Sequence, residues 1–481
     1  MARSVKANFI YSLINTVSGF VFPLITFPYV SRILQADGIG EVNFYNSIIN
    51  YVILLTGLGI PVYGIREIAK VRDKKNDLEQ TLAEILSLHL ILNVIGYVAI
   101  FAICIFIDQI GNAELFLLLS LTLFLNTIGC GWFYSGVEDF KYIAVRSIIV
   151  RTISVILLFL LVRDKQDLIF YGVYNVFVSG GSNILNFFRL RNYISLNELK
   201  KLKLNLIKHI KPASSIFILN LITSIYINLD KVMLGFIKGS TAVGYYTSAS
   251  QISHILLTAV SVLGSVMLPR ASNLIQNNNI EEFFRLSEKS YHFILLLSLP
   301  IALGCIALAP DLIYLFCSSS YEPAINTLRL LAPVVIAIGM SNQIGMQILY
   351  PLGKVKLITI STGVGALTNI VLNLLLIPIL AQNGAAIATL CAEFSVTITQ
   401  IVITREIIPY KFISVKNFKY LGAAIIMLFV CLFLKYLNMS SIVNIIVIPI
   451  VGAISYVTFM LITNDYLTKE IVSIIIFRSK K

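Results

Sequence analysis

Residues 228–235 read Asn228-Leu-Asp-Lys-Val-Met-Leu-Gly235 and place an acid, Asp230, and a base, Lys231, inside an apolar run. The run covers residues 212–237, which is long enough to cross a bilayer as a helix. A charge near the centre of such a helix costs about 2.5–3.5 kcal/mol on insertion scales. Neighbouring side chains on a helix do not face each other, so these two charges cannot pair. Each needs another helix, water or a ligand, and the stretch therefore predicts a helical bundle with a polar cavity.

The composition indicates a membrane protein with many spanning segments. Hydrophobic residues make up 57% of the 481 residues, charged residues make up 13%, and the mean hydropathy is +0.87. A soluble domain usually carries about 25% charged residues. The apolar runs have the length of membrane helices and lack the alternation of barrel strands, so we expect an all-α fold. Membrane topology explains the net charge of +13 better than nucleic-acid binding does.

The hydropathy pattern predicts about 14 transmembrane helices. They are expected at residues 8–30, 42–64, 81–107, 114–135, 143–162, 168–188, 212–237, 243–268, 290–309, 324–350, 357–380, 384–404, 419–437 and 441–462. With the N-terminus in the cytoplasm, thirty of the 37 Lys and Arg residues fall on the cytoplasmic side and five on the opposite side. This asymmetry predicts that both termini are cytoplasmic, with an uncleaved first helix.

The longest predicted cytoplasmic loop, which is rich in lysine, divides the chain. We expect an N-terminal six-helix lobe at 1–190, a basic linker at 191–211, a second six-helix lobe at 212–405, helices 13 and 14 at 406–463, and a cytoplasmic tail at 464–481. A shift of 204 residues aligns Gly40 with Gly244, Arg66 with Arg270 and Glu84 with Glu288. Because each lobe holds an even number of helices, the two repeats are predicted to be parallel.

Three arginines near the cytoplasmic helix ends, Arg66, Arg151 and Arg270, are candidate ligands for a diphosphate or a sugar. A guanidinium binds phosphate oxygens through a planar fork, so three of them could form the cationic floor of a cavity, with Lys231 as a further cation. The alternative is that each arginine only extends to anionic head groups at the membrane surface.

Two acids are candidate coupling or gating residues. Glu393 lies near the middle of the helix predicted at 384–404, with Thr389, Thr397 and Gln400 near the same face. It is either a protonatable cavity residue or a neutral, hydrogen-bonded contact between helices. Asp230, with Lys231, belongs either to an outer gate and the upper cavity or to an interfacial pair.

Two histidines in apolar runs, His89 and His254, are expected to be packing residues rather than proton carriers. The six cysteines are scattered, and neither a metal-ligand cluster nor a nucleotide-binding loop is present in the sequence. We therefore expect no catalytic residues, no metal and no cofactor.

Several stretches resemble the polysaccharide transporter (Wzx-type flippase) family of the multidrug/oligosaccharidyl-lipid/polysaccharide exporter superfamily. They are Phe27-Pro-Tyr-Val-Ser-Arg-Ile-Leu-Gln-Ala-Asp-Gly-Ile-Gly40, Gly57-Leu-Gly-Ile-Pro-Val-Tyr-Gly-Ile-Arg-Glu-Ile-Ala-Lys70, Gly131-Trp-Phe-Tyr-Ser-Gly-Val-Glu-Asp-Phe-Lys141, Leu229-Asp-Lys-Val-Met-Leu-Gly235 and Val243-Gly-Tyr-Tyr246. The resemblance weakens after about residue 405. One departure is Gln35-Ala36, where the family usually has Gly-Pro or a similar pair, and this is expected to affect only an outer turn.

The resemblance implies a bacterial inner-membrane protein with its lobes in a MATE-like arrangement. It implies that an undecaprenyl-diphosphate-linked oligosaccharide is flipped from the cytoplasmic to the periplasmic leaflet by alternating access, for O-antigen, capsule or exopolysaccharide synthesis. The partners it implies are this lipid-linked oligosaccharide and membrane lipids, and not nucleic acid. Coupling to H+ or Na+, and contact with a polysaccharide polymerase and chain-length machinery, stay open.

Three other functions of polytopic membrane proteins fit this sequence less well than flipping a lipid-linked oligosaccharide does. A MATE-like exporter of small molecules would favour an acidic, aromatic cavity, whereas the candidate charges here are mostly basic. A glycosyl polymerase or ligase needs a catalytic outer loop, and no predicted outer loop is long enough to hold one. A structural scaffold would have no reason to retain Glu393 in the middle of the membrane.

Overall fold

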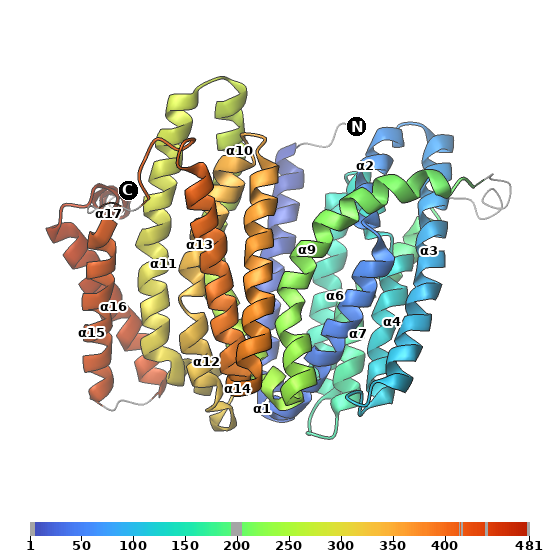
Figure 1. Cartoon of the computed structure of the whole chain (residues 1–481), viewed down its shortest axis with the longest axis horizontal. Helices are drawn as coiled ribbons and strands as arrows, with labels where there is room; N and C mark the ends of the chain where they lie inside the picture. Colours follow the sequence, from blue (N-terminus) through green and yellow to red (C-terminus); the bar gives the residue numbers. More distant parts are fainter. Residues whose placement is uncertain (1–4, 194–203, 413, 415–416, 438–440, 479–481) are drawn as a thin grey trace. The chain divides into compact units, whose positions relative to one another are not determined.

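The computed structural model describes residues 5–193, 204–412, 414, 417–437 and 441–478. The chain divides into two compact units, residues 1–244 (unit 1) and 245–481 (unit 2). Every regular element in the described part of the chain is helical (Figure 1). This confirms the predicted all-α fold.

Unit 1 is built on a long, kinked first helix. Its helices are α1 (Val5–Gly57), α2 (Ile60–Val71), α3 (Lys75–Phe106), α4 (Ala113–Ile128), α5 (Gly131–Gly136), α6 (Phe140–Leu161), α7 (Leu168–Leu190) and α9 (Ile207–Lys238). α1 contacts α3, α4, α6 and α9, and α2 packs on α3 and α5. A core cluster fills the space between α2, α3 and α5, and includes Ile68, Leu82, Trp132, Phe133 and Tyr134.

Unit 2 is built around α11. Its elements are α10 (Ser240–Gln276), which begins at the end of unit 1, then α11 (Ile280–Phe316), η1 (Ser319–Tyr321), α12 (Ala324–Leu331), α13 (Val334–Asn342), the π-helical η2 (Gln343–Leu349), α14 (Val355–Thr404), α15 (Phe418–Tyr436), α16 (Ser441–Ile462) and α17 (Tyr466–Arg478). α11 contacts α12, α13, α15, α16 and α17. Figure 1 shows α15 and α16 running beside α11.

Two helices each contain a pair of predicted spans. α1 includes the segment predicted at 8–30 and most of the one at 42–64, joined at Gln35 (φ 57°, ψ −173°), and α14 includes those at 357–380 and 384–404, joined at Ala381 (φ 47°, ψ −128°). Ten helices in the described residues are long and apolar enough to cross a membrane, and α1 and α14 each count once among them. The exact count of fourteen crossings stays a prediction.

Three predicted helices are interrupted. The segment predicted at 42–64 breaks at Leu58 and Gly59, which have positive φ and separate α1 from α2. The segment predicted at 114–135 breaks at Cys130, which adopts a left-handed conformation between α4 and α5. The segment predicted at 324–350 is divided into α12, α13 and η2. Hydropathy does not reveal such breaks, because the side chains remain apolar across them.

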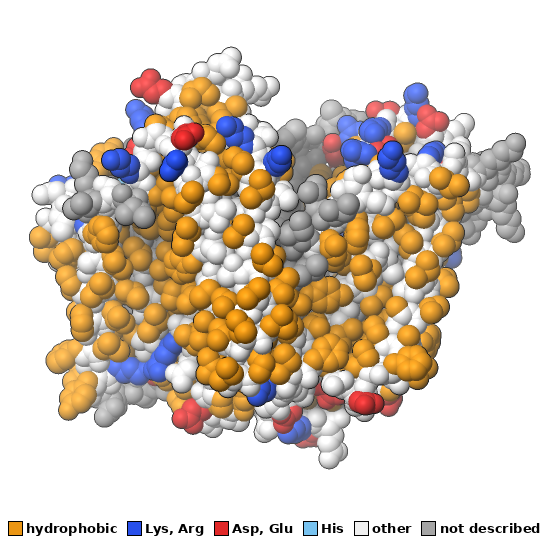
Figure 2. Space-filling view, in the orientation of Figure 1, with side chains coloured by type: hydrophobic (Ala, Val, Ile, Leu, Met, Phe, Trp, Pro, Cys, Tyr) orange, Lys and Arg blue, Asp and Glu red, His pale blue; other side chains and the backbone are white. Residues whose placement is uncertain are grey.

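The surface of each unit has the polarity of a membrane protein. Large apolar side chains are exposed along the helices, among them Ile105, Phe106, Ile379 and Phe433, each at least 68% exposed. Figure 2 shows charged side chains gathered near the helix ends of each unit, with hydrophobic side chains between them. Lipid tails, rather than protein, would cover such a surface.

Two of the positions that the predicted repeat aligns, Gly40 and Gly244, contact each other, while the repeat itself stays a prediction. A Cβ atom on Gly40 would lie 1.8 Å from the Ser240 carbonyl oxygen, and one on Gly244 would lie 1.9 Å from that of Ala36. Thr241 donates a hydrogen bond to Asp37, 204 residues earlier. Gly40 follows the kink of α1 at Gln35, and Gly244 lies near the start of α10.

The division by contacts falls elsewhere than the predicted lobe boundary. α9, which the sequence assigns to the second lobe, packs on α1 and α2 in unit 1. The lobe limits at 1–190, 191–211 and 212–405 stay a prediction, and residues 194–203 of the linker lie outside the described residues.

Candidate functional site

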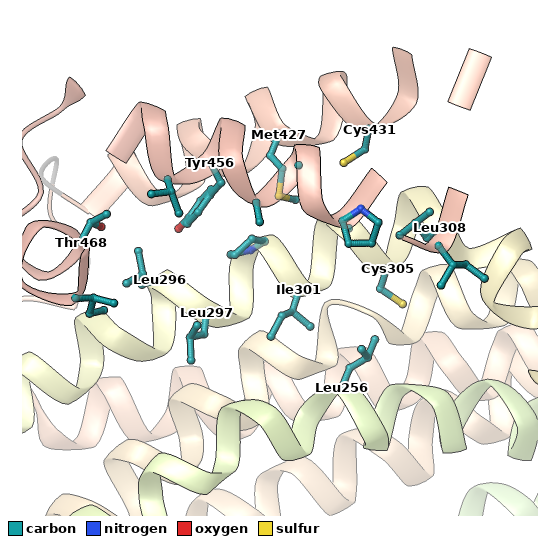
Figure 3. Close-up of a pocket in the computed structure, with 18 of the residues that line it drawn as sticks. Leu256, Leu296, Leu297, Ile301, Cys305, Leu308, Met427, Cys431, Tyr456 and Thr468 are labelled. Carbon is teal, nitrogen blue, oxygen red and sulfur yellow. The ribbon is translucent and has the colours of Figure 1, made fainter. Parts of the chain in front are cut away.

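An apolar pocket of about 620 Å³ in unit 2 could hold a ligand (Figure 3). α11 supplies one wall with Leu296, Leu297, Ile301, Cys305 and Leu308, and α10 adds Leu256. The opposite wall comes from α15, α16 and α17, through Met427, Cys431, Tyr456 and Thr468. We call this the apolar pocket.

Small residues and prolines open the apolar pocket. Pro300 and Gly304 lie on its α11 wall, and Pro449 and Gly452 lie on its α16 wall. A Cβ atom on Gly304 would meet only the Met427 Cε, at 3.8 Å, so the space beside Gly304 is open. The lining can therefore accept a flexible apolar chain, but it offers few polar groups to orient a compact ligand.

A smaller pocket in unit 1 is lined on α9 by Asn228, which precedes the charged pair Asp230 and Lys231 in the sequence. It has a volume of about 280 Å³ and is lined by Asn50, Ile53, Leu54, Gly57, Gly59, Pro61 and Asn228, from α1, α2 and α9. Asp230 is 4% exposed and Lys231 is half-buried, and both follow Asn228 on the same helix. The proposed roles of Asp230 and Lys231 in a cavity or gate stay predictions.

The two predicted cavity arginines of unit 1 have different partners. Arg66 lies on α2 with a 54% exposed side chain, 3.0 Å from a carboxylate oxygen of Glu67, and its guanidinium stands over the Tyr63 ring at 5.5 Å. Partial burial alone would raise the pKa of Glu67, but hydrogen bonds from Lys70 and Arg66 lower it below its ordinary value. This environment is that of a surface arginine.

Arg151 lies on α6, where it is half-buried against α1. Its guanidinium donates to the Asn15 carbonyl oxygen at 2.9 Å and to the Ser18 hydroxyl. Because these acceptors are neutral, the charge of Arg151 is hydrogen-bonded but not neutralised by them. That leaves it attractive to an anion.

In unit 2, Arg270 is exposed near the end of α10, 3.9 Å from a carboxylate oxygen of Glu282. Glu393 is buried in α14 at 9% exposure. Thr397 donates both to the Glu393 carbonyl oxygen, at 3.0 Å, and to that of Ala337 on α13, at 2.9 Å. The polar residues expected near the face of Glu393 are thus mostly buried within unit 2, while the role of Glu393 itself stays a prediction.

Two buried ionic clusters were missed by the sequence reasoning. In unit 1, Glu84 on α3 accepts hydrogen bonds from Lys208 at 2.6 Å and His209 at 3.0 Å on α9. In unit 2, Lys435 on α15 lies 2.9 Å from Asp311 on α11. A weak signal was available, because each cluster places a charge in or beside an apolar run. In the described part of the chain, no group of His, Cys, Asp and Glu is arranged to hold a metal ion.

These features define the class: a polytopic α-helical membrane protein with a long apolar pocket. The chain belongs to the family of polysaccharide biosynthesis proteins, whose model matches residues 5–275, more than half of its length. The MatE family model also matches residues 215–375.

Relatives and solved structures agree with this family. A "Putative O-antigen transporter" of Escherichia coli K12 is 24% identical over 408 residues, covering 84% of this chain and 97% of that protein. A "Probable flippase AglR" of Haloferax volcanii is 23% identical over 240 residues, covering 47% of this chain and 48% of that protein.

Among solved structures, the lipid II flippase MurJ in an inward closed conformation aligns with a TM-score of 0.75 at 16% identity, covering 95% of this chain and 99% of that one. An inward-facing multidrug resistance MATE transporter aligns with a TM-score of 0.65 at 15% identity, covering 80% and 94%. The fold is therefore the one that these transporters share.

Proposed function

We propose that this protein is a transporter that flips a polyprenyl-diphosphate-linked oligosaccharide repeat unit across the membrane, for the synthesis of a surface polysaccharide. The observation that carries the proposal is the apolar pocket of about 620 Å³ in unit 2. Such a pocket suits the prenyl chain of a lipid-linked sugar. The names of the relatives, O-antigen transporter and flippase, support the same substrate class.

The length of the apolar pocket argues for a prenyl chain over an ordinary acyl chain. Its α11 wall runs from Leu296 to Leu312, which at ~1.5 Å per residue is about 24 Å. One leaflet contributes only about 15 Å of hydrocarbon, half of a core about 30 Å thick. A chain that fills this wall therefore extends past the middle of the bilayer, as a long polyprenyl chain can.

The MATE-like alternative is a small-molecule exporter coupled to an ion gradient. The match to the MatE model and the shared fold are compatible with that function. An exporter of soluble compounds does not need a long apolar pocket on the flank of unit 2, so we favour the lipid substrate. A polymerase or ligase is disfavoured because the relatives are named transporters.

Direction, location and coupling are part of the proposal. The excess of Lys and Arg on one side favours a cytoplasmic location for both termini, in a bacterial inner membrane. We infer flipping from the cytoplasmic to the periplasmic leaflet by alternating access. Net export against a lipid gradient would draw on H+ or Na+, or on consumption of the product by a polymerase and its chain-length partner.

A pocket-filling substitution tests the proposal. Gly304→Leu places a side chain into the apolar pocket without meeting backbone, and Gly422→Leu on α15, where a Cβ atom would meet nothing within 4 Å, is the matched control. In vesicles holding a fluorescent polyprenyl-diphosphate oligosaccharide, Gly304→Leu should lower the flipping rate by about tenfold or more, as expected for ~1.5–3 kcal/mol of lost apolar burial. Gly422→Leu should flip normally. Equal rates in both variants would remove the pocket from the mechanism, and absence of flipping by the wild type would remove the function.

Reporter fusions test the orientation. The fusion points fall in or next to segments that join helices or, at Gln382, next to the kink inside α14. Fusions after Ile110, Ser240, Ser320 and Gln382 should report the outside, and fusions after Lys75, Asn205, Ile280 and Phe412 should report the cytoplasm. A reversal at any of these positions would contradict the predicted topology.

A further inference from the structure

A second, polar pocket of about 700 Å³ lies in unit 2 at the beginning of α11. Four cationic side chains line it: Arg270 from α10, Arg285 and Lys289 from α11, and Lys419 from α15. Three carboxylates, those of Glu282, Glu288 and Asp465, also line it. We call it the arginine pocket, after Arg270 and Arg285.

The two lysines make short ion pairs, whereas the two arginines do not. Lys289 Nζ lies 2.7 Å from both carboxylate oxygens of Glu470, and Lys419 Nζ lies 2.5 Å from Asp465. Arg270 has only the long 3.9 Å contact with Glu282. Within the described residues, Arg285 has neither a hydrogen bond nor an ion pair. The donors still available to a ligand are therefore guanidinium groups, whose planar fork matches a phosphate.

The buried carboxylate of the arginine pocket, that of Asp465, is already hydrogen-bonded by protein groups. Asp465 is 2% exposed and accepts hydrogen bonds from the Tyr420 hydroxyl and from both the backbone nitrogen and the hydroxyl of Thr468, each at 2.9 Å. Together with Lys419, these groups balance its charge. Asp465 therefore repels an anion at the arginines much less than an unpaired carboxylate would.

The arginine pocket adjoins the apolar pocket. Thr468, which is bonded to Asp465 at the arginine pocket, lines the apolar pocket (Figure 3). On α11, Lys289 and His292 line the arginine pocket, and Leu296 is the first residue of this helix that lines the apolar pocket. Their spacing places them on neighbouring turns of one helix. A ligand that fills both pockets must have an anionic head and a long apolar chain.

We infer that the arginine pocket binds the phosphate group of a polyprenyl phosphate lipid whose chain lies in the apolar pocket. This inference rests on the proposed function for the identity of the chain. It adds a docking site on the flank of unit 2, formed by Arg270 and Arg285. It also gives Arg270 a role other than the predicted floor of a transport cavity.

Binding by the full-length protein in detergent tests the inference without any transport step. The probes are undecaprenyl phosphate, the corresponding polyprenol, inorganic phosphate and phosphatidylglycerol. The variant is R270Q/R285Q, and the control is Arg405→Gln, an exposed arginine outside both pockets. The double variant should bind undecaprenyl phosphate about tenfold more weakly or worse, since a hydrogen bond to a charged group contributes ~1.5–3 kcal/mol. Its affinity for polyprenol and the affinities of Arg405→Gln should not change.

Several results would overturn the inference. Wild-type affinity in R270Q/R285Q would show that the arginines only extend to the membrane surface. Equal competition by phosphatidylglycerol would indicate an ordinary anionic-lipid surface, and competition by inorganic phosphate at similar concentration would indicate a site for the free ion. If R270Q/R285Q binds normally while Gly304→Leu loses flipping, the phosphate site fails and the proposed function stands. If the arginines govern binding but the wild type flips nothing, the proposed function fails alone.

Discussion

Replacing Glu84 by glutamine should destabilise unit 1 far more than replacing an equally well-paired surface glutamate. The Glu84 side chain is fully buried, and its carboxylate accepts from Lys208 at 2.6 Å, from His209 at 3.0 Å and from the backbone nitrogen of Asn205 at 3.0 Å. His209 is in turn 2.6 Å from the hydroxyl of Tyr63 on α2. The carboxylate thus connects the start of α9 to α2 and α3.

The size of the effect follows from burial. Removing one partner of a buried ion pair costs about 3–5 kcal/mol, because the remaining charge is left without compensation. The Lys208 side chain is 49% exposed and can turn to water, which lowers the cost. A glutamine can still accept one hydrogen bond but cannot neutralise the lysine, so we expect a loss of about 2–3 kcal/mol.

The control is Glu138→Gln, which removes an equally short contact of 2.6 Å with Arg72, between side chains that are 47% and 37% exposed. Thermal unfolding of the purified variants should show a clear loss for Glu84→Gln and none for Glu138→Gln. Hydrogen exchange at residues 207–212 should also accelerate in Glu84→Gln, because the start of α9 loses its attachment. If the two variants unfold alike and exchange is unchanged, the carboxylate does not hold α9 in place.

Three further predictions concern other parts of the chain. Gly244→Val should prevent normal folding, because its Cβ atom would lie 1.9 Å from a backbone oxygen of α1. The membrane-inserted variant should therefore lose its resistance to protease. A Gly244→Val protein that folds normally would refute the close crossing. Burial alone would raise the pKa of Asp465, but hydrogen bonds from Lys419 and Thr468 lower it below the ordinary 3.8. The ionised Asp465 should therefore stabilise the fold fully above about pH 4, and this stabilisation should be lost as the pH falls through the depressed pKa. Asp465→Asn should therefore unfold at lower temperature than the wild type at pH 7, and the gap should close in strong acid; a gap independent of pH would contradict the ionic role. Glu393→Gln should abolish any dependence of flipping on a pH gradient in proteoliposomes while the protein still inserts, and an unchanged gradient response would leave Glu393 as a packing contact.

The helical architecture could be predicted from the sequence because membrane helices are local. A run of apolar residues satisfies its own backbone hydrogen bonds, so its length alone indicates a span. The shift of 204 residues also singled out Gly40 and Gly244, which contact each other in the structure, while the repeat itself stays a prediction. The interruptions at Cys130 and at residues 343–349 could not be found, since a change in backbone hydrogen bonding leaves hydropathy unaltered.

The site was harder to predict because its parts are distant in the sequence. The sequence showed that Lys435 and Asp311 are charges in or near apolar runs, but not that they lie 2.9 Å apart. It identified Arg270 but not Arg285, because an arginine between helices looks like any other loop cation. The apolar pocket combines residues of α10, α11, α15, α16 and α17, and no single segment carries its signature.

The crossing of residues 36–40 with residues 240–244 restricts which residues these positions can hold. In a symmetric dimer, a residue on the two-fold axis contacts its own copy in the other subunit. Gly40 and Gly244 stand in that relation within one polypeptide, as do Asp37 and Thr241. Because each glycine lies against the backbone of the other segment, a side chain added at either position would push the two segments apart. The crossing therefore requires a glycine on both sides, whereas residues 37 and 241, which meet through side chains, can differ in chemistry.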